Sequence, residues 1–122
     1  MKKKILIIED SKITSDVLKQ VLETEGYEVF VSNDSINGIR IARREKPELI
    51  LLDLLLPKLS GYEICDILKK DNETRKIQIL AISTLDKPES IERIKSCGAI
   101  NFMKKPYNLD DLLREIKKIL NP

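Results

Sequence analysis

Short apolar runs alternate with longer segments of helical period along the whole chain. The runs lie at Lys4–Ile8, Glu28–Ser32, Leu49–Asp53, Ile77–Ile82 and Ile100–Met103, and each is four to six residues long. Several are continuously apolar, which is typical of parallel strands covered on both faces. Each run is followed by a segment whose apolar residues recur at helical spacing. The pattern therefore predicts five strand-then-helix units.

The five helices are marked by apolar stripes and by residues at their ends. Gly26, Pro47 and Gly98 follow the first, second and fourth helices, and Asn108 precedes the fifth; such residues commonly stop or start helices. A stripe is the face of a helix that is expected to pack on the sheet. The stripes are Ile13, Val17, Leu18, Val21 and Leu22; Ile36, Ile39 and Ala42; Ile64, Cys65, Ile67 and Leu68; Ile91 and Ile94; and Leu109, Leu112, Leu113, Ile116, Ile119 and Leu120.

Alternating strands and helices favour an α/β fold, in which right-handed crossovers place helices on both faces of a parallel sheet. We expect a doubly wound, five-stranded (βα)5 sheet that fills residues 1–122 as one domain and leaves no room for an output domain. A leucine-rich repeat has units of similar length, but its asparagine ladder is missing. Doubly wound sheets bind ligands at the carboxyl ends of their strands, where the strand order reverses.

Composition narrows the possible functions. The 22 Lys and Arg residues nearly balance the 20 Asp and Glu, and a net charge of +2 lacks the excess of a general nucleic-acid binder. The apolar run Ile5–Ile8 is too short for a signal peptide or a membrane span. Cys65 and Cys97 are expected to be buried free thiols of a reducing, cytoplasmic compartment. The absence of His excludes a His-bearing zinc site and a catalytic triad.

Polar residues gather at the ends of four of the five expected strands. These residues are Glu9 and Asp10 at the first strand, Asp53 at the third, Ser83 and Thr84 at the fourth, and Lys104 and Lys105 at the fifth. The second strand ends in Ser32, Asn33 and Asp34, which we interpret as a turn and helix cap without a functional role.

Taken singly, these residues have ordinary explanations: Asp10 caps a helix, or Lys105 is a solvated loop charge. Asp53 is harder to dismiss, because it is a lone carboxylate within the apolar stretch Leu49–Leu56 and a buried carboxylate needs a partner. Carboxylates at neighbouring strand ends repel one another, and a divalent cation would offset their charge. All-oxygen ligands favour Mg²⁺, and such a site offers an Asp nucleophile, a lysine and a hydroxyl donor for phosphoryl transfer.

The chain resembles a response-regulator receiver domain of two-component signalling over essentially its whole length. The segments that carry the resemblance are Ile5-Leu6-Ile7-Ile8-Glu9-Asp10, Leu51-Leu52-Asp53-Leu54-Leu55-Leu56-Pro57 with Gly61, Leu80-Ala81-Ile82-Ser83, and Gly98-Ala99 leading through Phe102 to Lys105-Pro106-Tyr107. The resemblance implies a CheY-like sheet of strand order 2-1-3-4-5 in a signalling domain. Such a domain is not an enzyme acting on other molecules, although it promotes its own phosphorylation and dephosphorylation.

By this resemblance, Asp53 accepts a phosphoryl group from a sensor histidine kinase or a phosphotransfer protein. Mg²⁺ is held by Glu9, Asp10, Asp53 and the backbone carbonyl of Leu55. The resemblance further implies that Ser83 is the switch hydroxyl and that Phe102 is the aromatic switch. It implies that Lys105 is the phosphoryl-binding lysine, and the proline that follows this lysine is typically cis in the family. Phe102 is equally well explained as an ordinary core aromatic. The fourth helix, fifth strand and fifth helix would present the signal to an effector protein, and the chain is expected to be a monomer or a phosphorylation-dependent dimer.

Several positions depart from the family pattern. Gln78 replaces the usual Pro, Thr84 the usual small residue, and Lys58 and Ser60 the common Gly and Asp. The two positions that tune hydrolysis in this family hold Leu55 and Leu85, whose side chains do not orient water. We therefore expect a long-lived phosphorylated form; the alternative is that the leucines only shield apolar surface.

Three other functions remain as alternatives. A haloacid-dehalogenase-type phosphatase or a Toprim-like nuclease is disfavoured. Both typically need a second Asp at the position where this chain has Leu55. A flavodoxin-like cofactor binder is disfavoured by the acidic loop Glu9–Lys12, which would repel a phosphate. A degenerate receiver that only binds partners is disfavoured by the intact set of acidic, hydroxyl and lysine residues.

Overall fold

The computed structural model describes residues 2–85 and 87–121. Its strands are β1 (Lys4–Ile8), β2 (Glu28–Ser32), β3 (Leu49–Asp53), β4 (Gln78–Ser83) and β5 (Asn101–Lys104). The helices are α1 (Lys12–Thr24), α2 (Ser35–Glu45), α3 (Gly61–Lys70), α4 (Pro88–Cys97) and α5 (Leu109–Leu120). The strands form one parallel sheet in the order β2-β1-β3-β4-β5, which confirms the expected α/β topology.

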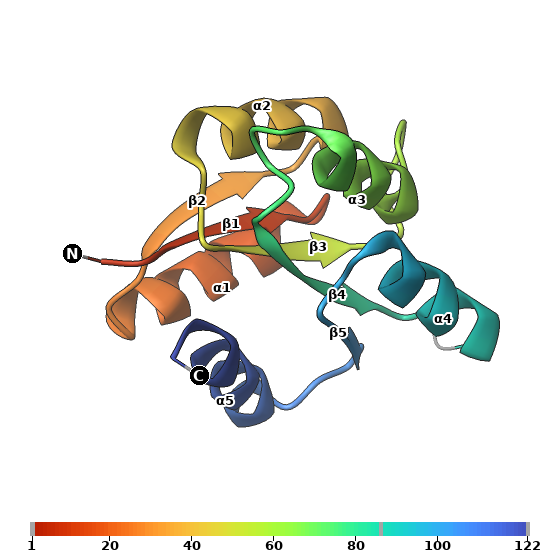
Figure 1. Cartoon of the computed structure of the whole chain (residues 1–122). Helices are drawn as coiled ribbons and strands as arrows, with labels where there is room; N and C mark the ends of the chain where they lie inside the picture. Colours follow the sequence, from red (N-terminus) through yellow and green to blue (C-terminus); the bar gives the residue numbers. More distant parts are fainter. Residues whose placement is uncertain (1, 86, 122) are drawn as a thin grey trace.

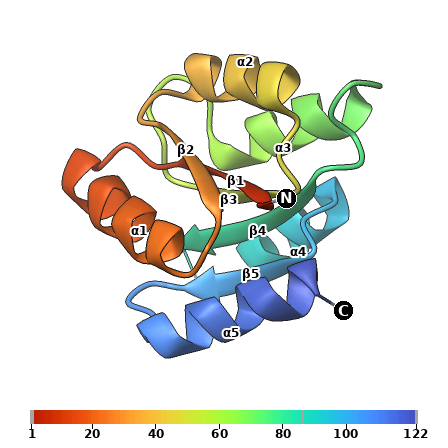
Figure 2. The ribbon, with the colours of Figure 1, turned by 90° about the vertical axis from the view of Figure 1, so that its left-hand side faces the viewer.

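The sheet has a hydrophobic core on each face. Successive strand residues point to opposite faces, so a continuously apolar strand serves both cores. Leu6 and Ile8 pack with α2, α3 and α4, whereas Ile5 and Ile7 pack with α1 and α5. Figures 1 and 2 show α2 and α3 on one side of the sheet and α1 and α5 on the other. This arrangement explains why the central strands carry apolar side chains at every position except their ends.

Helix caps occur where the sequence provides them. Ser60 and Glu63 form a reciprocal capping box at the start of α3, and the Asn108 side chain accepts hydrogen bonds from the first amides of α5. Asp34 caps α2 through the amides of Ile36 and Asn37, as its position after β2 predicts. Lys105–Pro106 is a cis peptide bond, as the resemblance implies.

Some strand bounds and apolar stripes differ in detail from the sequence predictions. β4 and β5 each begin and end one residue later than the apolar runs indicate, so Ser83 and Lys104 are the last residues of strands. Ile13, Val17 and Ile36 belong to the expected stripes, yet their side chains are 80%, 58% and 52% exposed. Leu109, placed in the stripe of α5, is likewise exposed. Local periodicity defines the direction of an apolar face but not how much of that face the sheet covers.

The cysteines are free, as expected, but only one of them is buried. Cys65 on α3 lies in the core, where burial and the nearby Cys97 raise the pKa of its thiol to about 11. Cys97, at the last position of α4, is half-buried because the end of the helix lies nearer to solvent than its middle. The Cys65 thiol therefore stays neutral and fills part of the core as a small apolar side chain.

The loop after β3 is fixed on both sides. Gly61 lies so close to this loop that an added Cβ would meet the Leu54 Cα at 2.6 Å and the Asp53 carbonyl oxygen at 2.7 Å. The buried Ser35 hydroxyl lies 3.0 Å from the Pro57 carbonyl oxygen and 2.8 Å from that of Leu59. These contacts hold the segment that follows Asp53 against α2 and α3.

Among the described residues, no helix has both the length and the apolar character needed to cross a membrane.

Candidate functional site

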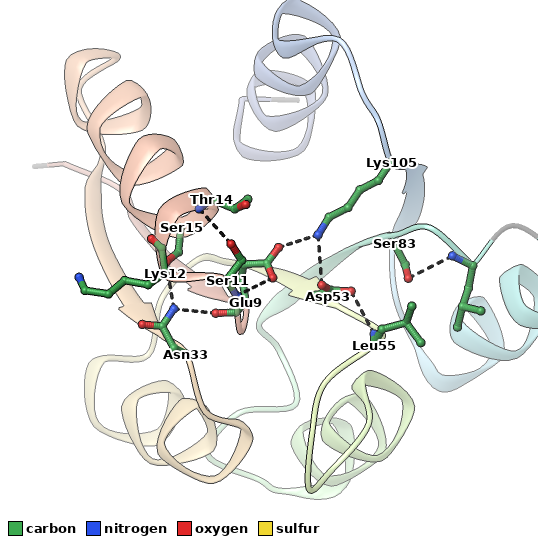
Figure 3. A network of polar contacts seen from close by, with 11 residues as sticks. Glu9, Ser11, Lys12, Thr14, Ser15, Asn33, Asp53, Leu55, Ser83 and Lys105 are labelled. Atoms are coloured by element: carbon green, nitrogen blue, oxygen red, sulfur yellow. Dashed lines mark hydrogen bonds and ion pairs between the residues drawn. The ribbon is translucent and has the colours of Figure 1, made fainter.

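Four strands place polar side chains at one edge of the sheet. Glu9 directly follows β1, Asp53 and Ser83 end β3 and β4, and Lys105 directly follows β5. Because all strands are parallel, their carboxyl ends lie at the same edge, next to the point where the strand order reverses. In Figure 3 the side chains of Glu9, Asp53 and Lys105 point toward one another. The structure therefore brings the predicted residues into one site.

Lys105 joins two buried carboxylates. Its ammonium group donates to Glu9 Oε1 at 2.6 Å and to Asp53 Oδ2 at 3.1 Å, and the two carboxylate residues are only 6% and 8% exposed. Burial lowers the pKa of Lys105, but hydrogen bonds and attraction to Glu9 and Asp53 outweigh that effect and raise the pKa overall. The lysine therefore stays charged and is the partner that buried Asp53 requires.

Glu9, Asp10 and Asp53 form an oxygen-rich cluster that fits a metal ion. One ligand oxygen from each of the three residues lies within 4.8 Å of the others. Desolvation at the site raises the pKa of Asp10, and its hydrogen bond to Glu9 and the negative charge of Glu9 raise it further. Carboxylate oxygens suit a hard cation such as Mg²⁺, which would relieve the repulsion. Among the described residues, no other group of three His, Cys, Asp or Glu side chains has metal-binding spacing.

Ser83 and Phe102 lie at the side of the site formed by β4 and β5. Ser83 is fully buried, and its hydroxyl accepts a hydrogen bond from the Leu85 amide at 3.2 Å. The Ser83 carbonyl accepts from the Lys105 amide at 2.9 Å, which couples the two strand ends. Phe102 is half-buried against the core, so it is neither a fully buried core aromatic nor an exposed one.

Two leucines flank the acidic cluster. The Leu55 amide donates to Asp53 Oδ1 at 3.0 Å, while the Leu55 side chain is 49% exposed. Leu85 is half-buried and packs against the core. The Leu55 amide therefore orients the Asp53 carboxylate, whereas neither leucine side chain has a group that binds water.

Asn33 is a site residue that sequence reasoning missed. Its side-chain amide donates to the Glu9 carbonyl at 2.7 Å and to the Ser15 hydroxyl at 2.9 Å, so it fixes the loop between β1 and α1. The Ser11 amide supports the same loop by donating to Glu9 Oε2 at 3.1 Å. Asn33 follows β2, which pairs with β1. Its position at the carboxyl edge that these two strands share is the feature from which a contact with the Glu9 loop could have been predicted. The interpretation of Ser32, Asn33 and Asp34 as a turn and helix cap did not take the pairing of β2 with β1 into account.

A doubly wound parallel sheet with this acidic edge, lysine and hydroxyl defines a class of signalling domains that accept a phosphoryl group. The chain belongs to the response regulator receiver domain family, whose model matches residues 5–117. The resemblance expected from the motifs is thus confirmed.

Known relatives agree with this assignment. The chain is 31% identical over 120 residues to the polar-differentiation response regulator DivK of Brucella anthropi, with 98% of both chains covered. It is 33% identical to the DNA-binding dual master transcriptional regulator RpaA of Synechocystis, where 96% of this chain matches 48% of the relative. A CheY-like receiver domain from Methanospirillum hungatei superposes with a TM-score of 0.93 at 30% identity, covering 99% of this chain and 95% of the other.

Membership of the family establishes the general function. The chain is a phosphoacceptor domain of two-component signalling, and it belongs to a family of signalling domains that are mainly non-enzymatic. Domains of this family interact with histidine kinases or phosphotransfer proteins and with effectors, and they bind Mg²⁺ at an acidic pocket. In the described part of this chain, Glu9, Asp10 and Asp53 form an acidic cluster with metal-binding spacing.

Proposed function

We propose that Asp53 is the residue that accepts the phosphoryl group. The observation that carries this proposal is the buried Asp53 carboxylate, held by the Lys105 ammonium on Oδ2 and by the Leu55 amide on Oδ1. An Asp53 oxygen forms a bond to phosphorus, the phosphorus–nitrogen bond of a phosphohistidine breaks, and the leaving imidazole takes up a proton. A small phosphoryl donor would serve the same chemistry, so that the domain promotes its own phosphorylation.

We assign the metal ligands to Glu9, Asp10, Asp53 and the Leu55 carbonyl oxygen. When bound, Mg²⁺ would neutralise part of the carboxylate charge and hold phosphoryl oxygens. The Ser11 amide and Asn33 keep Glu9 and its loop in place. Glu9 also accepts from Lys105, so the same carboxylate positions the metal site and the lysine.

Ser83, Lys105 and Phe102 then transmit the change. A phosphorylated Asp53 gains negative charge and strong acceptor oxygens, to which the Lys105 ammonium and the Ser83 hydroxyl can donate. To do so, Ser83 exchanges its present hydrogen bond with the Leu85 amide for one to the phosphoryl group. The movement of the β4 loop changes the space beside Phe102, and the surface of α4, β5 and α5 reports the state to an effector.

This proposal also covers the setting of the protein. We propose a cytoplasmic domain, since its two free thiols fit a reducing compartment. Its phosphoryl donor is a sensor kinase or a phosphotransfer protein, and its effector is a protein rather than nucleic acid. A monomer or a phosphorylation-dependent dimer is compatible with the mixed charges on α5.

The central test is phosphorylation of the purified chain by acetyl phosphate or phosphoramidate with Mg²⁺. Intact-mass spectrometry is expected to show one added phosphoryl group on the wild type and none on Asp53→Asn. Asp66→Asn, an exposed change of the same kind on α3, is the matched control and should be phosphorylated like the wild type. A wild type that gains no mass, or an Asp53→Asn chain that gains it equally, would show the assignment to be wrong.

A further inference from the structure

A groove between α2 and α3 is the feature that the phosphorylation mechanism leaves without a role. It has a volume of about 430 Å³ and lies between α2 and the β3–α3 segment. α2 and α3 share one face of the sheet, and Figure 1 shows them side by side above it. The groove is lined by Ile36, Ile39, Arg40, Arg43, Leu59 and Ile67.

The floor of the groove is aliphatic and partly open to solvent. Ile36 is 52% exposed, whereas Leu59 and Ile67 are half-buried and Ile39 is buried. An Ile at the second position of a surface helix gains little from folding when half of it stays exposed. These residues therefore leave a small apolar hollow that side chains of a partner could fill.

The rim of the groove is cationic. The Arg40 side chain is exposed and makes no ion pair or hydrogen bond with any other described residue. Arg43 donates from Nε to Asp71 at 2.6 Å, which leaves its terminal nitrogens available. No carboxylate lines the groove. An anionic partner therefore fits the rim, and guanidinium groups favour carboxylates, which they bind with two parallel hydrogen bonds.

We propose that the α2–α3 groove docks an acidic amphipathic helix of a partner protein. Apolar side chains of that helix would lie on Ile36, Leu59 and Ile67, and flanking Glu or Asp side chains would pair with Arg40 and Arg43. A nucleic acid fits less well, because the groove offers no aromatic side chain for base stacking. A membrane surface fits less well, because the apolar residues line a hollow between helices instead of projecting from the surface.

The groove is separate from the surface assigned to the phosphorylation signal. α3 lies between it and α4, so one partner can bind here while another contacts α4, β5 and α5. It also adjoins the segment that follows Asp53, because Leu59 lines the groove and its carbonyl is held by Ser35. The inference therefore goes beyond the proposed phosphoacceptor role and does not depend on it.

The test uses two fluorescent helical peptides of about four turns with the same leucine face. One peptide carries Glu on the flanks and the other carries Lys. Anisotropy should show binding of the Glu peptide and at least about tenfold weaker binding of the Lys peptide. Amide shifts in an NMR titration should fall on α2, Leu59 and α3.

Matched variants separate the groove from the rest of the surface. Ile36→Ser and Arg40→Ala should each weaken binding of the Glu peptide by about tenfold. Ile13→Ser, at an exposed Ile on the opposite face, and Arg44→Ala, on α2 but outside the groove, should leave binding unchanged. All four positions are exposed, so unchanged thermal unfolding will show that the variants fold.

Absence of binding, equal binding of both peptides, or shifts confined to other elements would overturn the proposal. The proposal would also be overturned if RNA or anionic phosphatidylserine vesicles bound at Arg40 more tightly than the Glu peptide does. Asp53→Asn should bind the Glu peptide like the wild type. That result keeps a failure of the docking inference distinct from a failure of the phosphoacceptor assignment.

Discussion

At the scale of single residues, the main property of the site is the close spacing of its negatively charged groups. Three carboxylates share the edge of the sheet, and one ammonium group, on Lys105, contacts two of them. Asp10 is the carboxylate left outside those contacts, and its raised pKa reflects desolvation and the proximity of Glu9. Its charge is useful for binding a cation and unfavourable without one.

Asp10→Asn is therefore expected to stabilise the metal-free protein. A carboxyl whose pKa is raised by folding destabilises the folded state once it is ionised at neutral pH, and this effect disappears as the pH falls toward its pKa. The free energy of unfolding at pH 7 with EDTA should rise, measured by urea denaturation, but by less than about 1 kcal/mol, because Asp10 is exposed and solvent screens its charge. With saturating Mg²⁺ the order should reverse, because the variant loses a metal ligand. An equal gain with and without Mg²⁺ would contradict this explanation.

The second prediction at this scale concerns the lifetime of the phosphorylated form. Leu55 lies beside Asp53 and has no side-chain group that orients an attacking water. Leu55→Asn should speed loss of the phosphoryl group by about tenfold, which corresponds to about 1.4 kcal/mol in activation free energy. The decay of phosphorylated Asp53 is followed by intact-mass spectrometry after removal of the donor.

Ile36→Asn, an exposed apolar residue away from the site, is the control for that experiment. Its phosphorylated form should decay like the wild type. If the wild type loses its phosphoryl group rapidly, and Leu55→Asn decays no faster, then the two leucines only cover apolar surface.

At the scale of elements, the segment between β3 and α3 determines where Asp53 and the Leu55 carbonyl lie. The segment is short and held by Ser35 and by the close approach of Gly61. Lys58 lies within it at a φ of 69°, in the left-handed region that L residues rarely adopt. Its side chain forms an ion pair with Asp34 at 2.9 Å.

Gly61→Ala is expected to damage this segment. The added Cβ would meet backbone atoms of Asp53 and Leu54, which side-chain rotation cannot relieve. The cost should be about 3 kcal/mol in urea denaturation, with slower phosphorylation because Asp53 is displaced. Gly38→Ala is the matched control, since its Cβ meets the end of the Ile8 side chain and Ala favours the helix. Equal costs for the two variants would contradict the argument.

Lys58→Gly should stabilise the protein, because Gly adopts a positive φ without a steric penalty. Lys58→Ala is the comparison, since it removes the same ion pair but keeps the penalty. The Gly variant should be more stable than the Ala variant by about 1 kcal/mol in thermal unfolding. A more stable Ala variant would show that the loop is not strained at this position.

At the scale of the whole molecule, Lys105 connects the acidic edge to the proposed output surface. It contacts carboxylates from β1 and β3, while its own amide is bonded to the end of β4. A change in charge on Asp53 therefore acts at once on three strand ends. This connection would be the physical basis for the proposed response in α4, β5 and α5.

Lys105→Ala should uncouple phosphorylation from that response. Mg²⁺ affinity should be little changed, because the lysine is not a ligand, while amide shifts in α4 and β5 upon phosphorylation should be largely lost in NMR spectra. Lys104→Ala, at the exposed end of β5, is the control and should respond like the wild type. An unchanged response in Lys105→Ala would remove this lysine from the switch.

Much of this protein is readable from its sequence because the signals are local. Short apolar runs define β1, β2 and β3 to the residue. The central strand β3 is covered on both faces and has no polar residue until its last position, Asp53. Asp34, Ser60 and Asn108 are cap residues whose chemistry acts within one helical turn. The acidic, hydroxyl and lysine residues stand at strand ends, so parallel topology predicts that they lie at one edge of the sheet.

Only the tertiary structure decided the features that depend on neighbours distant in sequence. Asn33 supports Glu9 because β2 pairs with β1, which no local pattern states. Ile13 and Ile36 have helical spacing but stay exposed, because the sheet covers only part of each stripe. The groove beside Ile36 and Arg40 exists because α2 and α3 pack around the β3–α3 segment. Periodicity thus determined the elements, whereas the extent of contact between them determined which surfaces remain available for binding.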